Sequence, residues 1–254
     1  MKKIIFTPLL ICALCFTITV EAKTVTVAAV IDGDTFTTEK GEHVRLLHIN
    51  TPEMGHDGRR SQPFAEKAKK RLKNLIEGRR VTLKFETTER DRYKRLLAHV
   101  YKGKKWINKE MISSGLAHVY TFPDNRGAKI SSLIQAEQIA RDHAYGFWKT
   151  ARWTVRNTDR LDNDTLIGKY QLIQGKVKNV AQVKGITYLN FGNDWRNDFT
   201  VEIPKKFKKY FTESNIKPKT FYQGKELLVR GVLKPVNGTL ITVTHPEQLT
   251  VLSK

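Results

Sequence analysis

Cysteine is almost absent from this sequence of 254 residues, and its two cysteines, Cys12 and Cys15, both lie in one apolar stretch near the N-terminus. The rest of the chain therefore cannot form a disulfide framework, and a hydrophobic core has to supply the stability. No cysteine pair and no His-x-x-His spacing points to zinc. These absences leave a globular chain without covalent cross-links.

Acidic residues are also scarce, since 25 Asp and Glu face 45 Lys and Arg, which gives a formal net charge of +20 at pH 7. A positive field of this size attracts polyanions, either nucleic acid or an anionic envelope polymer. A charged surface that only keeps the protein soluble is the alternative, because formal charge does not show where the charges lie.

The N-terminal residues 1–22 have the pattern of a secretory signal peptide. Met1-Lys2-Lys3 is positively charged, the stretch from Ile4 to Val20 is almost wholly apolar, and Val20-Glu21-Ala22 places small residues at the cleavage positions. We therefore expect a monomeric mature chain that begins near Lys23, has no disulfide and no membrane contact, and resides in the periplasm, at the cell surface or in the medium. A retained membrane anchor is the alternative, because the apolar run nearly reaches the length of a spanning helix.

Strand and helix patterns over residues 23–148 predict a first, mainly β domain. The strands are expected at 24–31, 35–38, 43–49, 81–85 and 96–101, and the helices at 63–78, at 108–115 with Asn108 as the cap, and at 129–143. Five strands with helices between and after them suit a closed barrel of the oligonucleotide-binding (OB) type better than a parallel α/β sheet.

A second domain is predicted beyond a polar stretch without periodicity, residues 149–168, which is expected to be a linker. Residues 169–254 again contain five strand patterns, at 170–183, 186–191, 198–203, 227–233 and 239–244, with a basic helix at 205–211. We expect a second small OB-like barrel, so the overall class is mainly β with α (α+β). Aromatic residues between Lys and Arg in this domain indicate either a nucleic-acid groove or core strands beside a solvated face.

The stretch from Ile31 to Glu53 holds the groups that a metal-assisted phosphodiester hydrolase needs. Such an enzyme requires an activated water, a cation, and donors for the charge that develops on the phosphate. Asp34 can bind a hard cation such as calcium, and Thr51 can add its carbonyl oxygen. Glu53 is the candidate general base. Arg45 and, further along the chain, Arg95 can each donate two parallel hydrogen bonds to phosphate oxygens.

Each of these signals has an ordinary structural alternative. Asp32-Gly33-Asp34 also occurs in hairpins that bind no metal. Thr51-Pro52-Glu53 can simply begin a helix. Arg45 can form a cross-strand ion pair, and Arg95 can be one of many arginines in a basic loop.

In their joint order, however, four motifs resemble the thermonuclease family of staphylococcal nuclease-like proteins, over about residues 24–148. The motifs are I-D-G-D-T at 31–35, R-L-L-H-I-N-T-P-E at 45–53, D-R-Y-K-R at 91–95 and G-L-A-H-V-Y at 115–120. The resemblance implies an OB barrel with three helices and calcium-dependent hydrolysis of DNA and RNA that leaves 3′-phosphate ends.

The resemblance also implies roles for individual residues. Asp34 corresponds to a calcium ligand, Arg45 and Arg95 to the phosphate-binding arginines, and Glu53 to the base. Asp32 and Thr35 flank the metal ligand, Asp91 belongs to the loop of Arg95, and Tyr93 and Tyr120 are expected at the substrate. These statements follow from the family pattern and not from spacing.

Two positions depart from the family pattern. Asn50 replaces a second calcium aspartate, which keeps an oxygen ligand but removes one negative charge. Lys94 replaces a glycine, which shifts the loop backbone or adds a phosphate contact. The alternative to a calcium-dependent nuclease is a non-catalytic envelope protein that binds nucleic acid or another polyanion.

Overall fold

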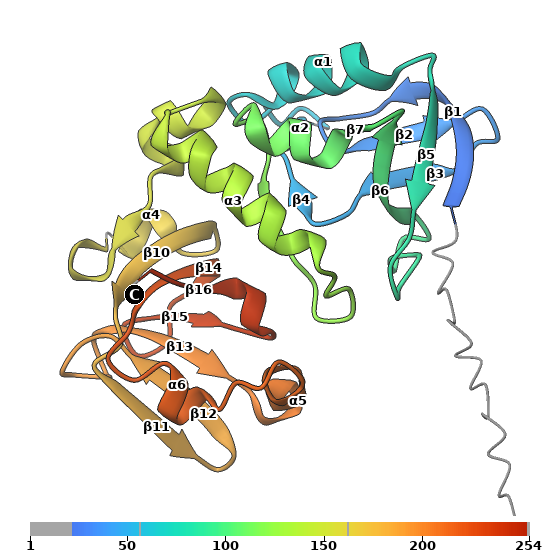
Figure 1. Cartoon of the computed structure of the whole chain (residues 1–254). Coiled ribbons are helices and arrows are strands. Elements are labelled where there is room, and N and C mark those ends of the chain that lie inside the picture. Colours follow the sequence, from blue (N-terminus) through green and yellow to red (C-terminus); the bar gives the residue numbers. More distant parts are fainter. Residues whose placement is uncertain (1–21, 56, 162, 253–254) are drawn as a thin grey trace, which may run out of the picture.

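The protein is described by a computed structural model that covers residues 22–55, 57–161 and 163–252, and it contains two β-barrels that lie side by side (Figure 1). The predicted signal peptide lies outside the described residues except for Ala22, and so do both cysteines. Within the described ranges, no helix is both long enough and apolar enough to cross a membrane.

Five strands close the first barrel and a short sixth strand extends its edge. They are β1 (Ala22–Val30), β2 (Thr35–Thr38), β3 (His43–Leu46), β5 (Arg80–Lys84), β6 (Leu96–Lys102) and the short β7 (Lys105–Trp106). The sheet order is β3-β2-β1-β5-β6, and β3 then pairs with β6 in parallel, which closes the ring. The predicted OB-type barrel is confirmed.

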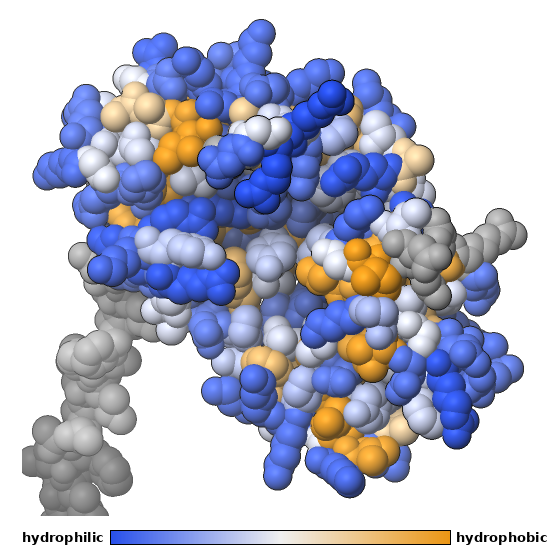
Figure 2. All heavy atoms as spheres, turned by 180° about the vertical axis from the view of Figure 1, so that it is seen from behind, coloured by the Kyte–Doolittle hydropathy of each residue, from blue (hydrophilic) through white to orange (hydrophobic). Residues whose placement is uncertain are grey.

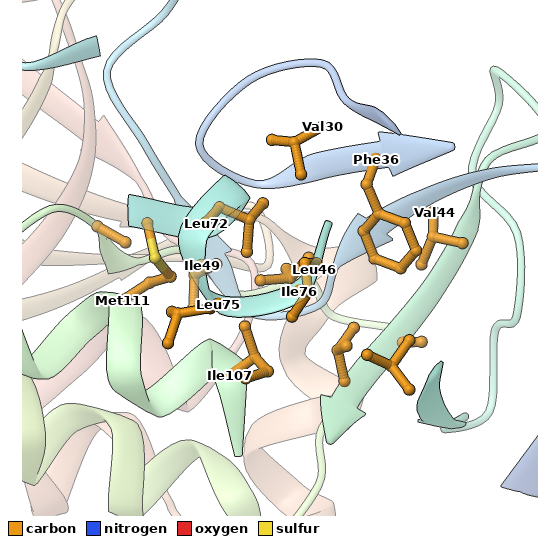
Figure 3. Packing of buried hydrophobic residues seen from close by; sticks show 14 of the residues in the cluster. Val30, Phe36, Val44, Leu46, Ile49, Leu72, Leu75, Ile76, Ile107 and Met111 are labelled. Carbon is orange, nitrogen blue, oxygen red and sulfur yellow. The ribbon is translucent and has the colours of Figure 1, made fainter. Parts of the chain in front are cut away.

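Three helices cover this barrel, as predicted: α1 (Ala65–Ile76), α2 (Ile107–Ser113) and α3 (Lys129–Asp142). The apolar positions of α1 recur every three or four residues, so Leu72 and Ile76 lie on one face and are fully buried. Figure 3 shows this face directed toward Phe36 and Leu46 of the barrel. Truncation of Leu72 to alanine would cost about 2–5 kcal/mol.

The predicted third strand, 43–49, is interrupted. β3 ends at Leu46, and His48 adopts a left-handed backbone with φ of 63°. The chain then forms β4 (Ile49–Asn50), which pairs with β8 (His118–Val119) outside the barrel. Because of this break, Ile49 and Asn50 pair with β8 and are not part of the barrel sheet.

The prediction that Asn108 caps α2 is wrong. The helix begins at Ile107, and Asn108 is fully buried inside it. Its amide accepts a hydrogen bond from Val100 N (2.9 Å) and donates to Leu47 O (2.8 Å) and Ala98 O (3.3 Å). The side chain therefore satisfies buried backbone groups of the barrel, which an isolated sequence pattern does not distinguish from a cap.

The second barrel repeats the topology of the first. Its strands are β10 (Tyr170–Lys176), β11 (Asn179–Val183), β12 (Ile186–Asn190), β13 (Phe199–Ile203), β14 (Glu226–Lys234), β15 (Thr239–Thr242) and the short β16 (Leu249–Val251). β13 and β15 pair in parallel, as β3 and β6 do. β10 pairs with β14, and β11, which follows β10 directly in the chain, pairs with β12. The segment from β10 to β11 therefore connects the two ends of the strand order. The helices α5 (Lys208–Glu213) and α6 (Pro218–Phe221) stand between the third and fourth strands, where α1 stands in the first barrel.

The segment 149–168, predicted as a linker, carries short elements of its own. β9 (Arg156–Asn157) runs parallel to β10. α4 (Asn163–Leu166) places Leu166 in the core of the second barrel. The second half of this segment is therefore packed onto the C-terminal domain.

Candidate active site

A cleft of about 610 Å³ opens on the first barrel and brings most of the predicted site residues together. Nine of the twelve line it: Asp32, Asp34, Arg45, Asn50, Glu53, Asp91, Tyr93, Arg95 and Tyr120. Thr35, Thr51 and Lys94 are not among its lining residues. The cleft joins segments that are separated by up to 93 positions in the sequence.

The tight turn between β1 and β2 places the Asp34 carboxylate at the base of the cleft, where it is almost fully buried. Its Oδ2 accepts hydrogen bonds from Thr51 N (2.8 Å) and Thr51 Oγ1 (3.0 Å), and its Oδ1 accepts one from Thr35 Oγ1 (3.1 Å). Thr35 and Thr51 therefore orient Asp34 from below the cleft surface. A Cβ at Gly33 would lie 2.6 Å from both Ala68 Cβ and Thr51 Oγ1, so only glycine fits the turn.

The Arg45 guanidinium is fixed in direction by four neighbours. Nε lies 3.0 Å from Asp34 Oδ1, Nη1 donates to Leu46 O and Ile49 O (2.8 Å each), and Nη2 donates to Asn50 Oδ1 (2.7 Å). The interruption at His48 supplies two of these acceptors, because it turns the Ile49 and Asn50 backbone back toward β3. A lysine at position 45 could not reproduce this planar set of bonds.

Carboxylates crowd this end of the cleft. Burial, and next the neighbouring Asp34 charge, raise the pKa of Asp32 to about 6. Desolvation and then Asp34 also raise the pKa of Glu53, while Arg45, the Asn50 amide and Arg95 oppose the rise. A proton is therefore held more firmly at Asp32 and Glu53 than on an ordinary carboxyl group.

The donor set fits a hard divalent cation. All candidate ligands are oxygens, and a cation would relieve the repulsion that raises the pKa of Asp32. Two of the candidate ligand oxygens already accept hydrogen bonds. Asn50 Oδ1 accepts from Arg45, and the Thr51 carbonyl oxygen accepts from Asn50 Nδ2 (3.2 Å). Each oxygen would have to give up its hydrogen bond to bind a metal.

The loop 87–95 forms one wall of the cleft and is organised by Asp91. Its Oδ1 accepts from Tyr93 N (2.9 Å) and Arg95 N (3.0 Å), and its Oδ2 lies 2.8 Å from both Nε and Nη2 of Arg95. Tyr93 is 64% exposed, with the guanidinium groups of Arg92 and Arg95 at 4.7 and 5.5 Å from its ring centroid. An exposed ring between two cations can stack on a base while the cations contact phosphates.

Lys94 keeps the backbone that a glycine would provide at this position. Its φ is 64°, in the left-handed region, and its carbonyl accepts a hydrogen bond from Arg90 Nη1 (2.8 Å). A non-glycine residue in this region costs about 1–2 kcal/mol. The loop therefore tolerates the substitution at an energetic cost.

Residues 120–125 form the opposite wall, and sequence reasoning missed most of them. The amide of Asn125 accepts from Thr88 N (2.7 Å) and donates to Thr88 O (2.9 Å), which ties the two walls together. Phe122 packs edge-on against Tyr120. No local pattern marks these residues, because their partners lie far away in the chain. Arg90 and Arg92, also unassigned beforehand, could have been found from the density of arginine in the loop.

The second barrel supports this opposite wall directly. Tyr170 OH donates to Val119 O (3.0 Å), and His245 Nε2 lies 2.6 Å from Thr121 Oγ1. Arg126 bonds to Glu247 and Glu213 at 3.1 Å each. Both domains therefore determine the shape of the cleft.

A fully buried ion pair anchors the same segment from within. Arg230 of β14 places Nη1 at 2.9 Å from Oε2 of Glu137, which lies on α3 between the two barrels (Figure 1). The second oxygen of Glu137 accepts a hydrogen bond from Val119 N (2.7 Å). Although burial opposes the charge, Glu137 holds the pKa of Arg230 above its usual value.

Comparison with known proteins identifies the family of the N-terminal domain. The family model described as staphylococcal nuclease homologue matches residues 43–150. A thermonuclease of Staphylococcus intermedius is 31% identical over 133 residues, which cover 51% of this chain and 79% of that protein. An uncharacterized endonuclease of Haemophilus influenzae is 35% identical over 155 residues, covering 58% of this chain and 79% of the relative.

A probable endonuclease of Pyrenophora tritici-repentis is 37% identical over 128 residues, which are 47% of this chain and 45% of that longer protein. The chain belongs to the staphylococcal nuclease family. Its N-terminal domain is of the nuclease class, a phosphodiester hydrolase, while the second barrel lies beyond the matched family model.

Proposed function

We propose that this protein is a calcium-dependent, sugar-nonspecific endonuclease that hydrolyses DNA and RNA and leaves 3′-phosphate ends. The observation that carries the proposal is the convergence of Glu53, Arg45 and Arg95 on one cleft whose base holds Asp32 and Asp34. The names of the relatives support the reaction class. The calcium requirement rests on the oxygen donors.

In the proposed mechanism Glu53 removes a proton from the water that attacks phosphorus, the bond between phosphorus and the 5′ oxygen breaks, and the leaving 5′ oxygen takes a proton from solvent. Its raised pKa makes it a stronger base than an ordinary glutamate, and the group acts only when deprotonated. Bound calcium, held by Asp34 with Asn50 and the Thr51 carbonyl, would neutralise a phosphate oxygen. Arg45 and Arg95 donate hydrogen bonds to the charge that develops on the phosphate. Arg95 exchanges part of its pairing with Asp91 for the substrate.

Substitution of the base and of an arginine tests the mechanism. Glu53→Gln and Arg45→Ala should each lower kcat for plasmid DNA by at least about a hundredfold, while binding measured in the absence of cleavage changes little. Arg152→Ala, outside the cleft, is the matched control for the arginine. Cleavage at the wild-type rate in either cleft variant would contradict the assignment.

Cleavage of supercoiled plasmid and of RNA, with calcium, with magnesium and with excess chelator, tests the cofactor and the substrate range. We expect activity on both substrates with calcium and none with chelator. Retardation of DNA in calcium without any shortening would instead select the non-catalytic polyanion-binding protein.

We propose that the second barrel adds affinity for single strands through its open sheet face. A hollow of about 550 Å³ lies there, beside Tyr188, Asn190 and the 49%-exposed Trp195. None of the described residues that line it is Lys or Arg, so the face would contact bases more than phosphates. The face of the molecule shown in Figure 2 is mostly hydrophilic, with smaller apolar patches.

Trp195→Ala tests this role better than truncation after Thr150, because truncation also removes the supports of residues 119–126. We expect weaker binding of single-stranded DNA with unchanged cleavage chemistry. An unchanged affinity and salt slope would exclude the face as a nucleic-acid groove.

We also propose that the protein is exported and acts as a monomer in the periplasm, at the cell surface or in the medium. The proposal rests on the pattern of residues 1–22. N-terminal sequencing of the protein recovered outside the cytoplasm should begin near Lys23, and an intact Met1 would contradict it.

A further inference from the structure

A second cluster of metal-binding side chains lies apart from the cleft, formed by His48, Glu86 and His99. His48 stands in the turn after β3, Glu86 follows the end of β5, and His99 lies within β6. The two imidazoles are 0% and 1% exposed and the carboxylate is 14% exposed. None of the three lines the cleft that holds Asp34 and Glu53.

The ligand atoms of this cluster converge on one point. Glu86 Oε2 lies 3.0 Å from His48 Nε2, and Glu86 Oε1 lies 2.8 Å from His99 Nε2. One candidate ligand atom from each residue lies within 4.8 Å of the other two. Two nitrogens on a tetrahedral zinc ion are about 3.3 Å apart, because each Zn–N bond is about 2.0–2.1 Å. Modest rotations of the side chains would therefore close the site around an ion.

The charges also suit a cation. Burial works against the Glu86 charge, but the hydrogen bonds from His48 and His99 lower the pKa of Glu86 to about 2, so it is anionic at neutral pH. Burial lowers the pKa of His99, which keeps this imidazole neutral. A neutral imidazole and a carboxylate bind a divalent metal, and here each ring proton that Nε2 now donates to Glu86 would move to Nδ1 so that Nε2 is free to bind the ion.

His48 has a costly backbone for its position. Its φ of 63° lies in the left-handed region, and its ring is completely buried beside His99, with 5.5 Å between the ring centroids. Strained backbone of this kind persists where the surrounding structure holds a side chain in a required place. The same backbone also turns Ile49 and Asn50 toward Arg45, so the ligand distances and the burial of the two imidazoles, and not the strain, are the evidence for a metal site.

We propose that His48, His99 and Glu86 form a binding site for one divalent transition-metal ion, with Zn²⁺ the best match to two imidazoles and one carboxylate. The ion would join three segments of the first barrel that no disulfide can join. Solvent would fill a fourth position. The site is independent of the calcium cleft, so it stands whether or not the proposed nuclease activity is calcium-dependent.

Co²⁺ is the probe for the geometry, because its visible absorption reports tetrahedral coordination. Tag-free, chelator-treated full-chain protein should bind about one Co²⁺ per chain, and Zn²⁺ should displace it and raise Tm. His48→Asn, chosen because asparagine tolerates the left-handed backbone, and His99→Gln should each weaken binding at least tenfold and abolish the rise in Tm. His143→Asn, an exposed histidine outside the cluster, should behave as the wild type.

Circular dichroism of each variant checks that it is folded, and Glu86→Gln provides a third variant of nearly unchanged shape. Absence of Co²⁺ absorption and of any Zn²⁺ effect on the wild-type Tm would overturn the proposal and leave a metal-free hydrogen-bonded triad. Equal binding by wild type and all three variants would place the ion elsewhere and would also overturn it. Calcium-dependent cleavage plays no part in these readouts.

Discussion

At the scale of the residue, the site is a compact set of competing hydrogen bonds. Arg45 bonds to both Asp34 and Asn50, so a change at either of them alters a contact of the arginine. The replacement of a calcium aspartate by Asn50 is the main chemical departure from the family pattern. It leaves an oxygen in place and couples it to the arginine that is expected to contact phosphate.

Asn50→Asp should raise the affinity for calcium by about tenfold, because the added charge strengthens a hard-cation site. Isothermal titration and the calcium dependence of plasmid cleavage measure the effect. Asn74→Asp, at an exposed position of α1 outside the cleft, introduces the same charge and should change neither. Equal calcium affinities for wild type and Asn50→Asp would remove Asn50 from the metal site.

Asp32→Asn should stabilise the metal-free protein by about 1–2 kcal/mol at pH 7. The folded-state pKa of Asp32 is raised from 3.8 to about 6, so the folded protein binds the proton more tightly than the unfolded chain. The Asp32 carboxyl group therefore lowers the free energy of unfolding progressively as pH rises from about 4 to 6. Below about pH 4 the group is protonated in both states and does not affect stability. The asparagine oxygen can still accept from Asp34 N, as Asp32 Oδ1 does.

Urea unfolding in chelator at pH 4 and at pH 7 measures this difference, with the exposed Asp57→Asn as the control. A gain of the same size at both pH values would show that the carboxylate charge is not its cause.

At the scale of the element, two loops form the walls of the cleft, and a side chain of one is hydrogen-bonded to the backbone of the other. The loop 87–95 is organised internally by Asp91 and is tied to residues 120–125 through Asn125. Since residues of both walls line the cleft, we expect the relative position of the walls to affect substrate binding more than chemistry.

Asn125→Ala should raise KM for DNA by about tenfold and change kcat less, because it removes two hydrogen bonds of about 1 kcal/mol each between the walls. Steady-state kinetics measures the changes in KM and kcat separately. Faster hydrogen exchange of the backbone amides of residues 87–95 would show that the loop is less rigid. Asn74→Ala, at an exposed position of α1 outside the cleft, is the control. A variant with wild-type KM and unchanged exchange would show that the tie to Thr88 does not position the wall.

At the scale of the whole molecule, the second barrel contacts the segment of the first domain that borders the cleft. The buried Glu137–Arg230 pair and the contacts of Tyr170 and His245 all reach residues 118–121, beside the cleft. The second barrel therefore acts on the site even before any role in binding nucleic acid is considered.

Arg230→Met should destabilise the protein by about 3–5 kcal/mol and weaken cleavage, because it leaves the Glu137 charge buried without its partner. Glu137→Gln should also destabilise, and the double variant should lose less than the sum of the two. Denaturant unfolding of the four proteins gives the coupling, and the exposed Arg196→Met is the control. Additive losses would show that the two side chains do not stabilise each other.

The sequence by itself determined the local chemistry and both barrels. Period-two and period-3.6 patterns placed the strands and α1, since these patterns reflect burial of one face, and the ordered motifs indicated the site residues. Their roles and the calcium ligand set stay predictions.

The tertiary structure decided what depends on contacts between distant segments. Asn108 is a buried bridge and not a cap because its partners lie on other elements. The tie from Asn125 to Thr88, the Glu137–Arg230 pair and the His48–Glu86–His99 cluster join residues 37, 93 and up to 51 positions apart. No local pattern encodes such pairs, because closure of a barrel and docking of a domain bring them together.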